Sequence, residues 1–354
     1  MRIPLIALIA GMACLALPAQ AQECGPLKRA FSLDLETGPQ GLRYGVPVTV
    51  NGTKRTFLLD TGGAFTMISR EVAKQMGLSI LTARGVRMFD MYGNTVDGQY
   101  VVADVGIGPL TAGKAETMVS DIGGMDGILA PDYMMNYDVE LDFAGRKMNY
   151  FLTDHCDGRV IYWPATTIAA VPYRGWSSYR DTHMTIPVTI DGKQITATVD
   201  TGATSTTLNE NTARSLFDLT PDSPGAVPLG TMGNSNRKVF GWTFKTLAIG
   251  GITVTNPRIR VIPDLIGGRS TDTLEADSRV RRVTDNMAPT MLIGMDILKE
   301  LRVYIASKEK KLYVTAASAT VAEEPAPAGR GGRGGRGRGG RGRGPGDAAP
   351  EGEN

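Results

Sequence analysis

The chain contains 354 residues, of which 42% are hydrophobic and 21% are charged, so it is long enough for one large two-lobed core or for two domains of ordinary size. This composition excludes a chain that is disordered throughout. The formal net charge of +2 excludes a general electrostatic preference of the protein body for nucleic acid or for acidic membranes.

Residues 1–21 are typical of a secretory signal peptide. An apolar run over residues 3–17 follows Arg2, and the small-residue pattern Ala19-Gln20-Ala21 provides a cleavage site. The run is too short to span a bilayer comfortably, and no later stretch approaches transmembrane length. We therefore expect a mature protein without a membrane span that is periplasmic or secreted. A lipid anchor on Cys14 is the weaker alternative, because the residue three positions before it is not the Leu usual in that signal.

Two cysteines, Cys24 and Cys156, remain after removal of the signal and flank the first half of the protein. An oxidising compartment permits them to pair, so we predict a disulfide, with two free structural thiols as the alternative. The histidines, His155 and His183, have no partner at a metal-ligand spacing. The sequence therefore predicts neither a metal site nor a cofactor.

An internal repeat organises the chain. Residues 46–62 align without gaps on residues 186–202. Both stretches show an alternating strand, an Asn-Gly or Asp-Gly turn and a return strand that ends at an Asp. This pattern predicts a β-hairpin at the start of each copy.

The register of the repeat continues toward the C-terminus. Ser69 and Asn209 are good N-cap residues for short helices over residues 70–76 and 210–216. The second copy then carries an extra polar segment at residues 267–286, which we expect to be a surface loop.

The alignment resumes where residues 128–134 match residues 292–298, and it continues to Phe151 and Thr315. Each copy is thus a run of short strands with one or two small helices, which predicts a mostly β, duplicated architecture. The expected divisions are a signal peptide at 1–21, an N-terminal lobe at 22–157, a C-terminal lobe at 158–321 and a disordered tail at 322–354.

Each copy places the tripeptide Asp-Thr-Gly directly after an apolar strand, as Asp60-Thr61-Gly62 and Asp200-Thr201-Gly202. A single tripeptide of this kind is readily explained as a turn, since all three residue types favour or tolerate turns. Two copies in the register of the duplication indicate instead the two halves of one site.

These residues resemble the aspartic protease family, in both its bilobal pepsin-like and its retroviral branches, over residues from about 41 to 315. The resemblance includes the hydrophobic-hydrophobic-small segments at 128–130 and 292–294. It implies a bilobal aspartic protease fold made of two duplicated β half-barrels with a few short helices. It also implies that the two Asp loops meet on a pseudo-twofold axis and that Thr61 and Thr201 link them through hydroxyl hydrogen bonds to the opposite lobe.

Two departures from the family pattern bear on the branch. Ala130 stands where the family usually has Gly, and position 63 is Gly. These features favour a bacterial retroviral-like branch, here fused in tandem, over the pepsin-like branch. Because one chain supplies both Asp loops, the resemblance implies an active monomer.

Physical chemistry supports a joint role for Asp60 and Asp200. Two carboxylates held within hydrogen-bonding distance cannot both ionise cheaply, so they share one proton. The ionised partner can then accept a proton from water while the protonated partner polarises a peptide carbonyl. Gly62 and Gly202 let the backbone turn tightly, so that its amides can approach the carboxylates.

A further matched pair lies at the same distance from each Asp, where Tyr92-Gly93-Asn94 aligns on Met232-Gly233-Asn234. Each Gly-Asn is expected in a turn between two strands. We interpret Tyr92, Gly93, Met232 and Gly233 as candidates for a flap that closes over the substrate. An ordinary hairpin turn is the alternative interpretation.

The sequence therefore predicts an aspartic endopeptidase that acts on peptide or protein substrates. The Gly- and Arg-rich stretch at 329–344 cannot build a core, and we expect the tail to make weak contacts with surface polyanions. Two alternatives of other classes remain, a catalytically silent peptide-binding protein and a surface adaptor that works through its Arg-Gly tail.

Overall fold

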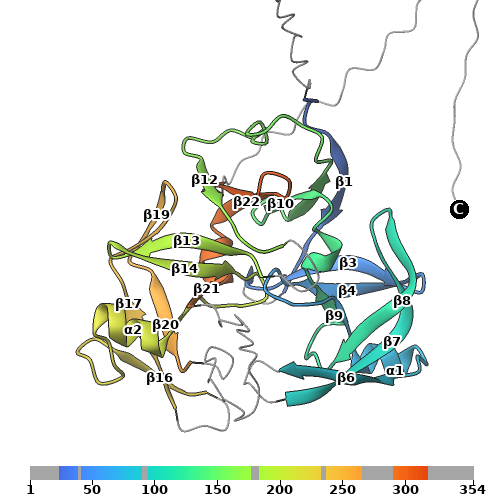
Figure 1. The fold of residues 1–354 in the computed structure, drawn as a ribbon, viewed down its shortest axis with the longest axis horizontal. Coiled ribbons are helices and arrows are strands. Elements are labelled where there is room, and N and C mark those ends of the chain that lie inside the picture. The colour runs from blue at the N-terminus through green and yellow to red at the C-terminus, as the bar shows by residue number, and fades with distance from the viewer. Residues whose placement is uncertain are drawn as a thin grey trace, which may run out of the picture. The chain divides into compact units, whose positions relative to one another are not determined.

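The computed structural model describes residues 24–38, 41–89, 95–176, 183–232, 237–264 and 290–317. All of them belong to one compact unit, in which the described strands form three sheets with a few short helices (Figure 1). Across these described ranges, every helix is too short or too polar to cross a membrane. The predicted signal peptide, the segment 267–286 and the tail lie outside the described residues.

The strands of the first copy form a sheet that closes on itself. In spatial order they are β2 (Glu36–Thr37), β3 (Tyr44–Val50), β4 (Thr53–Leu59), β9 (Gly127–Leu129), β5 (Met67–Ser69), β8 (Leu110–Ser120), β7 (Thr95–Ile107) and β6 (Leu81–Phe89). An additional pairing between β3 and β7 closes the barrel. Helix α1 (Arg70–Gln75) follows β5, and the short helix η2 (Pro131–Tyr133) follows β9.

The strands of the second copy repeat this arrangement. In spatial order they are β16 (Val227–Thr231), β17 (Lys238–Thr243), β20 (Arg258–Ile262), β15 (Thr207–Asn209), β21 (Met291–Ile293), β14 (Lys193–Val199), β13 (Thr185–Ile190), β18 (Thr246–Ile249) and β19 (Ile252–Thr255). The order β3-β4-β9-β5-β8-β7 of the first copy recurs as β13-β14-β21-β15-β20-β17. Helices α2 (Glu210–Phe217) and α3 (Met295–Leu298) take the places of α1 and η2. The mostly β, duplicated fold predicted from the repeat is thereby confirmed.

Both predicted hairpin turns form as expected. Asn51 and Gly52 have φ angles of 48° and 79°, and Asp191 and Gly192 have φ angles of 45° and 80°. Two successive residues with positive φ define a type I′ turn, whose twist matches that of the flanking strands. The turns fix the register of β3 with β4 and of β13 with β14, and hence the position at which β4 and β14 end.

The two predicted helices begin where the sequence indicates, but their caps differ. The side chain of Ser69 accepts a hydrogen bond from the amide of Val72 at the start of α1. Asn209 occupies the cap position of α2 without a capping hydrogen bond from its side chain. The carboxylate of Asp264, distant in sequence, accepts instead from the amide of Asn211 in the first turn of α2. A side chain from another loop has thus replaced the local cap.

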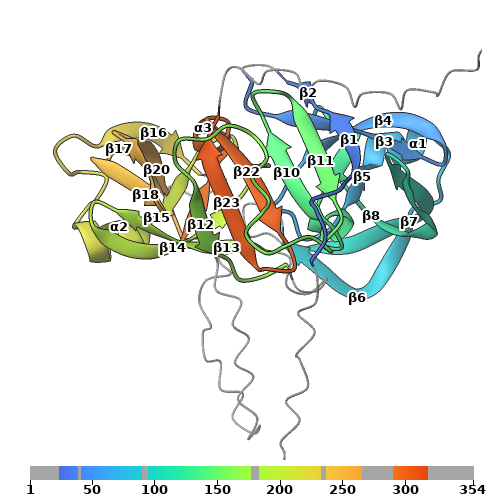
Figure 2. The same cartoon turned by 90° about the horizontal axis from the view of Figure 1, so that it is seen from above.

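A third sheet joins the two copies. Its order is β1 (Arg29–Asp34), β11 (Lys147–Phe151), β10 (Asp138–Asp142), β22 (Leu301–Ala306), β23 (Lys311–Ala316) and β12 (Ala169–Pro172). Strand β10 of the first copy pairs antiparallel with β22 of the second, and Figure 2 shows them between the two barrels. The buried Arg302 of β22 forms ion pairs with Glu140 and Asp142 of β10. Because these charges are buried, removing one partner would leave an uncompensated charge in the interior. The ion pairs therefore link a strand of one copy to a strand of the other.

Cys24 and Cys156 are joined by a disulfide, with a Cα–Cα distance of 4.7 Å. Hydrogen bonds flank this link, since the amide of Gly25 donates to the carbonyl of Asp154 and the amide of Cys156 donates to the carbonyl of Gly25. The segment before β1 is therefore fixed to the segment after β11.

Candidate active site

Asp60 and Asp200 follow directly after β4 and β14, and each is held by the strand that lies beside its own. Strand β4 pairs parallel with β9, and β14 pairs parallel with β21. At the ends of these pairings the amide of Asp60 donates to the carbonyl of Leu129, and the amide of Asp200 donates to the carbonyl of Ile293, both at 3.0 Å. The later segment of each copy therefore fixes the backbone on which its Asp is mounted.

The threonines that follow the aspartates connect the two loops. Thr61 donates its hydroxyl to the carbonyl of Val199 at 2.8 Å, and Thr201 donates its hydroxyl to the carbonyl of Leu59 at 2.9 Å. Each hydroxyl also accepts from the amide of the other threonine at 3.0 Å. Both threonines are almost fully buried. Four hydrogen bonds in a dry interface thus place one loop against the other.

The two carboxyl groups face each other across the loops. Asp60 accepts from the amide of Gly62 at 3.0 Å, and Asp200 accepts from the amides of Gly202 and Ala203 at 2.9 and 3.1 Å. A Cβ atom on Gly62 would lie 2.4 Å from Cγ of Asp200, and one on Gly202 would lie 2.5 Å from Cγ of Asp60. Each carboxyl group therefore lies directly over the glycine of the opposite loop, where only a hydrogen atom fits.

Electrostatics favours one shared proton. Burial, followed by the charge of Asp200 and the hydrogen bond with it, raises the pKa of Asp60 to about 7, although backbone amides of its own loop lower it. Burial also raises the pKa of Asp200, while amides of its loop, the hydrogen bond with Asp60 and the charge of the exposed His183 act in the opposite direction. The pair therefore retains a proton at pH values where ordinary carboxyl groups are ionised.

A hydrogen-bond network that the sequence did not predict supports the loop of the first copy. The amide of Thr66 donates to Asp132 at 3.0 Å, and its hydroxyl donates to the same carboxylate at 2.6 Å. The hydroxyl of Thr66 also accepts from the amide of Ala130 at 3.0 Å. The loop that carries Asp60 is thereby tied to the start of η2.

The second copy repeats this network residue for residue. The amide and hydroxyl of Thr206 donate to Asp296 at 2.8 and 2.7 Å, and its hydroxyl accepts from the amide of Gly294 at 3.1 Å. The internal repeat indicated these two aspartates, because Asp132 and Asp296 occupy matched positions. Only the folded chain shows that each of these carboxylates accepts hydrogen bonds from a threonine that lies six residues after Asp60 or Asp200.

The flap candidates lie mostly outside the described residues. Tyr92, Gly93 and Gly233 have no described position, whereas the amide of Met232 donates to the carbonyl of Arg237 at 3.2 Å. The strands on both sides are described, and β6 with β7, and β16 with β17, form antiparallel pairs. The strands that flank each expected turn are therefore paired, and the flap role remains a prediction.

Similarities to known proteins extend over both copies of the repeat. A family model described as aspartyl protease matches residues 46–132 and 186–297, which are the two copies of the repeat. Among solved structures, the crystal structure of an aspartic proteinase from Irpex lacteus is similar, with a TM-score of 0.48 and 16% sequence identity. That match covers 82% of this chain and 98% of the other. A search of curated protein sequences finds no significant match.

Proposed function

The chain belongs to the aspartyl protease family, and from that premise we propose that it is an endopeptidase in which Asp60 and Asp200 activate one water molecule against a peptide bond. The observation that carries this proposal is the mutual placement of the two carboxyl groups, which share one hydrogen bond and are each set over the glycine of the opposite loop. This placement supports a single site made by both copies.

The hydrogen bonds around the carboxyl groups support different roles for the two aspartates. Asp200 accepts from two backbone amides and from Asp60, and these donors stabilise its ionised form. For Asp60 the hydrogen bond with Asp200 acts in the opposite direction and, with burial and the charge of Asp200, raises the pKa, which favours the protonated form. In the proposed resting state Asp60 is therefore the acid and Asp200 the base.

The reaction then needs no covalent intermediate. Asp200 takes a proton from water, the resulting oxygen nucleophile attacks the peptide carbonyl carbon, and Asp60 donates its proton to the carbonyl oxygen. The tetrahedral intermediate collapses when one of its hydroxyl groups returns a proton to Asp60, the C–N bond breaks and the proton held by Asp200 passes to the departing nitrogen. One proton is again shared by the pair after the products leave.

The proposal also covers substrate binding, location and oligomeric state. The substrate binds as an extended strand across the lobes at 22–157 and 158–321, with Tyr92, Gly93, Met232 and Gly233 in a closing flap. The disulfide supports an oxidising location, consistent with export directed by residues 1–21. The protein acts as a monomer in the periplasm or after secretion, and the tail at 322–354 is dispensable for cleavage.

The test is digestion of a peptide library across pH, with and without a transition-state-like aspartic protease inhibitor. Cleavage that the inhibitor blocks, and that disappears in Asp60→Asn and in Asp200→Asn, supports the proposal. Cleavage that rises only above neutral pH contradicts the shared-proton mechanism. A folded wild type that binds library peptides without cutting any of them would replace the proposal with a silent peptide-binding protein.

A further inference from the structure

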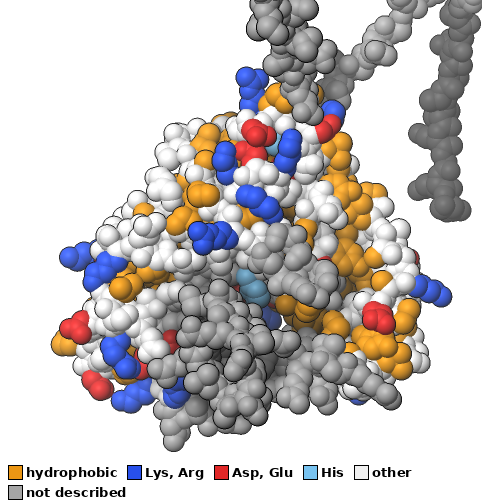
Figure 3. Space-filling model, in the orientation of Figure 1, with side chains coloured by type: hydrophobic (Ala, Val, Ile, Leu, Met, Phe, Trp, Pro, Cys, Tyr) orange, Lys and Arg blue, Asp and Glu red, His pale blue; other side chains and the backbone are white. Residues whose placement is uncertain are grey.

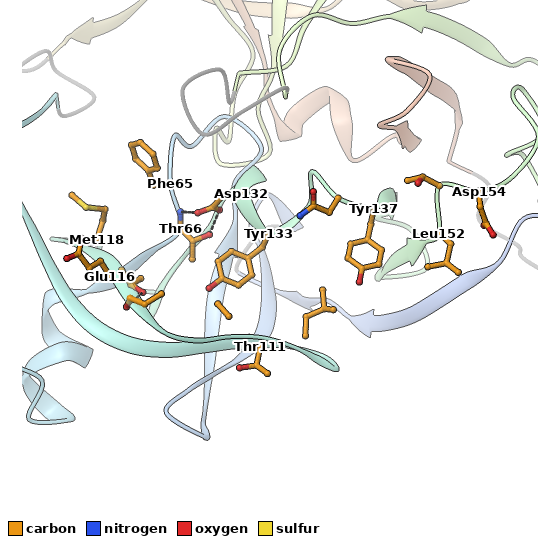
Figure 4. A pocket seen from close by; sticks show the side chains of 16 residues that line it. Phe65, Thr66, Thr111, Glu116, Met118, Asp132, Tyr133, Tyr137, Leu152 and Asp154 are labelled. Atoms are coloured by element: carbon orange, nitrogen blue, oxygen red, sulfur yellow. Dashed lines mark hydrogen bonds between the residues drawn. The ribbon is translucent and has the colours of Figure 1, made fainter.

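A concave site lies in the first lobe, lined by residues other than the paired aspartates. It is an open cavity of about 800 Å³ along strand β8, which we call the β8 groove (Figure 4). It starts at Phe65 and Thr66, in the segment that continues from the first Asp-Thr-Gly loop, and it ends at Leu152 and Asp154 beyond β11. Neither paired aspartate lines it, although Thr66 and Asp132 of the network beside Asp60 do.

One wall of the β8 groove is a strand edge that lacks a partner. Strand β7 pairs with β8 along its length, whereas β5 pairs with it only from Met118 to Ser120. Residues 110–117 therefore have no neighbour on their other side among the strands that the structure describes. Backbone groups at such an edge readily pair with an added strand. The eight residues offer an edge of about 27 Å at the usual rise per residue.

The opposite wall is apolar and held in place. The hydroxyl of Tyr133 donates to the carbonyl of Val105, and the ring of Tyr137 packs edge-on against Tyr150 with 5.6 Å between centroids. Leu152 is 40% exposed at the far end. Figure 4 shows both tyrosines facing β8 across the opening, and Figure 3 shows apolar side chains gathered over the flank that carries β1 and β8. Fixed walls lower the entropy cost of binding.

The charges of the groove have one sign. Its lining contains Glu116, Asp132 and Asp154 and includes no lysine, arginine or histidine. Asp132 is engaged by Thr66, and Asp154 forms an ion pair with Lys28. The exposed Glu116 has no ion pair within the part of the chain that the structure describes. An occupant with basic side chains therefore complements the groove better than an acidic one.

We propose that the β8 groove binds an extended polypeptide segment with apolar and basic side chains, paired backbone to backbone with residues 110–117. The unpaired edge selects a polypeptide in strand conformation, the tyrosine wall selects apolar side chains, and the exposed Glu116 selects basic ones. In an endopeptidase this segment belongs to a protein substrate, at a distance from the bond that is cut. That last identification rests on the proposed function, whereas the binding itself does not.

Direct binding tests the groove independently of catalysis. The probe is a fluorescein-labelled ten-residue peptide of alternating valine and lysine, titrated into the full chain carrying Asp60→Asn. We expect Leu152→Lys and Glu116→Lys each to weaken binding about tenfold. The matched control is Ile168→Lys, another exposed apolar position remote in sequence from the groove, which should leave the affinity unchanged. Equal affinity in all of these proteins would overturn the proposal.

The backbone pairing has its own test. Two versions of the probe carry N-methyl groups on alternate residues, one at odd and one at even positions, so that only one version keeps the amides that face β8. One version should bind like the parent and the other at least about tenfold more weakly. Two versions of equal affinity would exclude strand addition. A probe of alternating valine and glutamate should also bind at least about tenfold more weakly, and equal binding would remove the charge argument.

Cleavage assays separate this inference from the proposed function. The valine-lysine probe should slow cleavage of a protein substrate by the wild type and leave cleavage of a short peptide unaffected. Competition with the short peptide would place the probe at Asp60 and Asp200 and overturn the groove as its site. Binding without any cleavage activity would refute the endopeptidase while the groove remains. Concentration-dependent dimerisation that Leu152→Lys abolishes would identify a second copy as the occupant and refute a substrate segment.

Discussion

The amide of Thr61 donates to the hydroxyl oxygen of Thr201, and the amide of Thr201 donates to that of Thr61, each at 3.0 Å. Because each loop supplies the partners of the other, neither Asp-Thr-Gly loop is complete in one copy of the repeat. The candidate active site is therefore also part of the contact between the two copies.

Removing either hydroxyl should destabilise the protein. Thr61→Val leaves the amide of Thr201 and the carbonyl of Val199 buried without their partner, which should lower the free energy of unfolding by about 2–4 kcal/mol. Thr61→Ser keeps the hydroxyl and should cost about 1 kcal/mol for the lost methyl group. Urea unfolding measures both. Similar values for the two variants would mean that the hydroxyl bonds contribute little.

Removing either carboxyl group should abolish cleavage without unfolding the protein. Asp60→Asn and Asp200→Asn each keep the shape of the side chain but remove the shared proton, and each should lower kcat by about 10²–10⁴-fold. The double variant should lose little more, because the two groups act as one unit. Steady-state kinetics, with thermal melting as the control for folding, decides the matter. Additive losses would show that the aspartates work independently.

The raised pKa of Asp60 predicts a specific dependence of stability on pH. The folded protein keeps a proton up to about pH 7 that an unfolded aspartate releases near pH 4. The contribution of this group to stability is therefore fully present below about pH 4 and is lost as the pH rises through about 7. Melting temperatures from pH 4 to 8 should fall more steeply for the wild type than for Asp60→Asn. Parallel curves would contradict the raised pKa.

The activity of the wild type should depend on the same shared proton. Because one proton must remain on the pair, kcat/KM should decline as the pH rises above the pKa of about 7 assigned to Asp60. A second decline at acidic pH reports protonation of both carboxyl groups. A pH–rate profile measures the two limbs, and an activity that keeps increasing above pH 8 would be incompatible with this assignment.

Gly62 should tolerate a side chain less well than its neighbour Gly63. The added Cβ atom of Gly62→Ala would lie 2.4 Å from Cγ of Asp200, so the carboxyl pair must separate. We expect kcat to fall at least about a hundredfold, as small misplacements of reacting groups often cause. Gly63→Ala is the milder comparison, because its added Cβ atom would lie 3.1 Å from Oδ2 of Asp60, which is a tight contact but not an overlap. Equal losses in the two variants would contradict the steric explanation.

Breaking the disulfide should lower stability but not the activity of the folded protein. The bond closes a loop with a sequence separation of 132, and the double variant Cys24→Ser/Cys156→Ser should lose about 2–5 kcal/mol of unfolding free energy. Cleavage of short peptides well below the melting temperature should be unchanged, because the bond lies at the third sheet and not at the paired aspartates. Unfolding in urea and initial rates measure the two quantities.

Local patterns in the sequence predicted the local structure well. The Asn51-Gly52 and Asp191-Gly192 turns depend only on residues in the turn itself, which is why the hairpins and the ends of β4 and β14 could be predicted. The relation of Asp60 to Asp200 came instead from the duplication and from the family resemblance. No local pattern connects residues so far apart in the chain.

Interactions between distant segments explain what the sequence did not predict. Asp264 replaces Asn209 as the cap of α2 because the folded chain brings its loop to that helix. The pairing of β10 with β22 likewise joins strands that no turn connects. Asp132 was visible as a repeated residue, but its role depends on a threonine that only the tertiary structure brings within reach.

The pairing of β10 with β22 also limits how the polypeptide can be divided. A nick between β11 and β12 would cut the backbone without releasing fragments, since the ladder and the buried pair of Arg302 with Glu140 would still hold both pieces. A chain shortened to its first half would instead expose the edge of β10. Such an edge pairs readily with any available strand, including β10 of another shortened chain. The same edge that joins two repeats in one molecule would thus allow a half-length version to assemble as a homodimer.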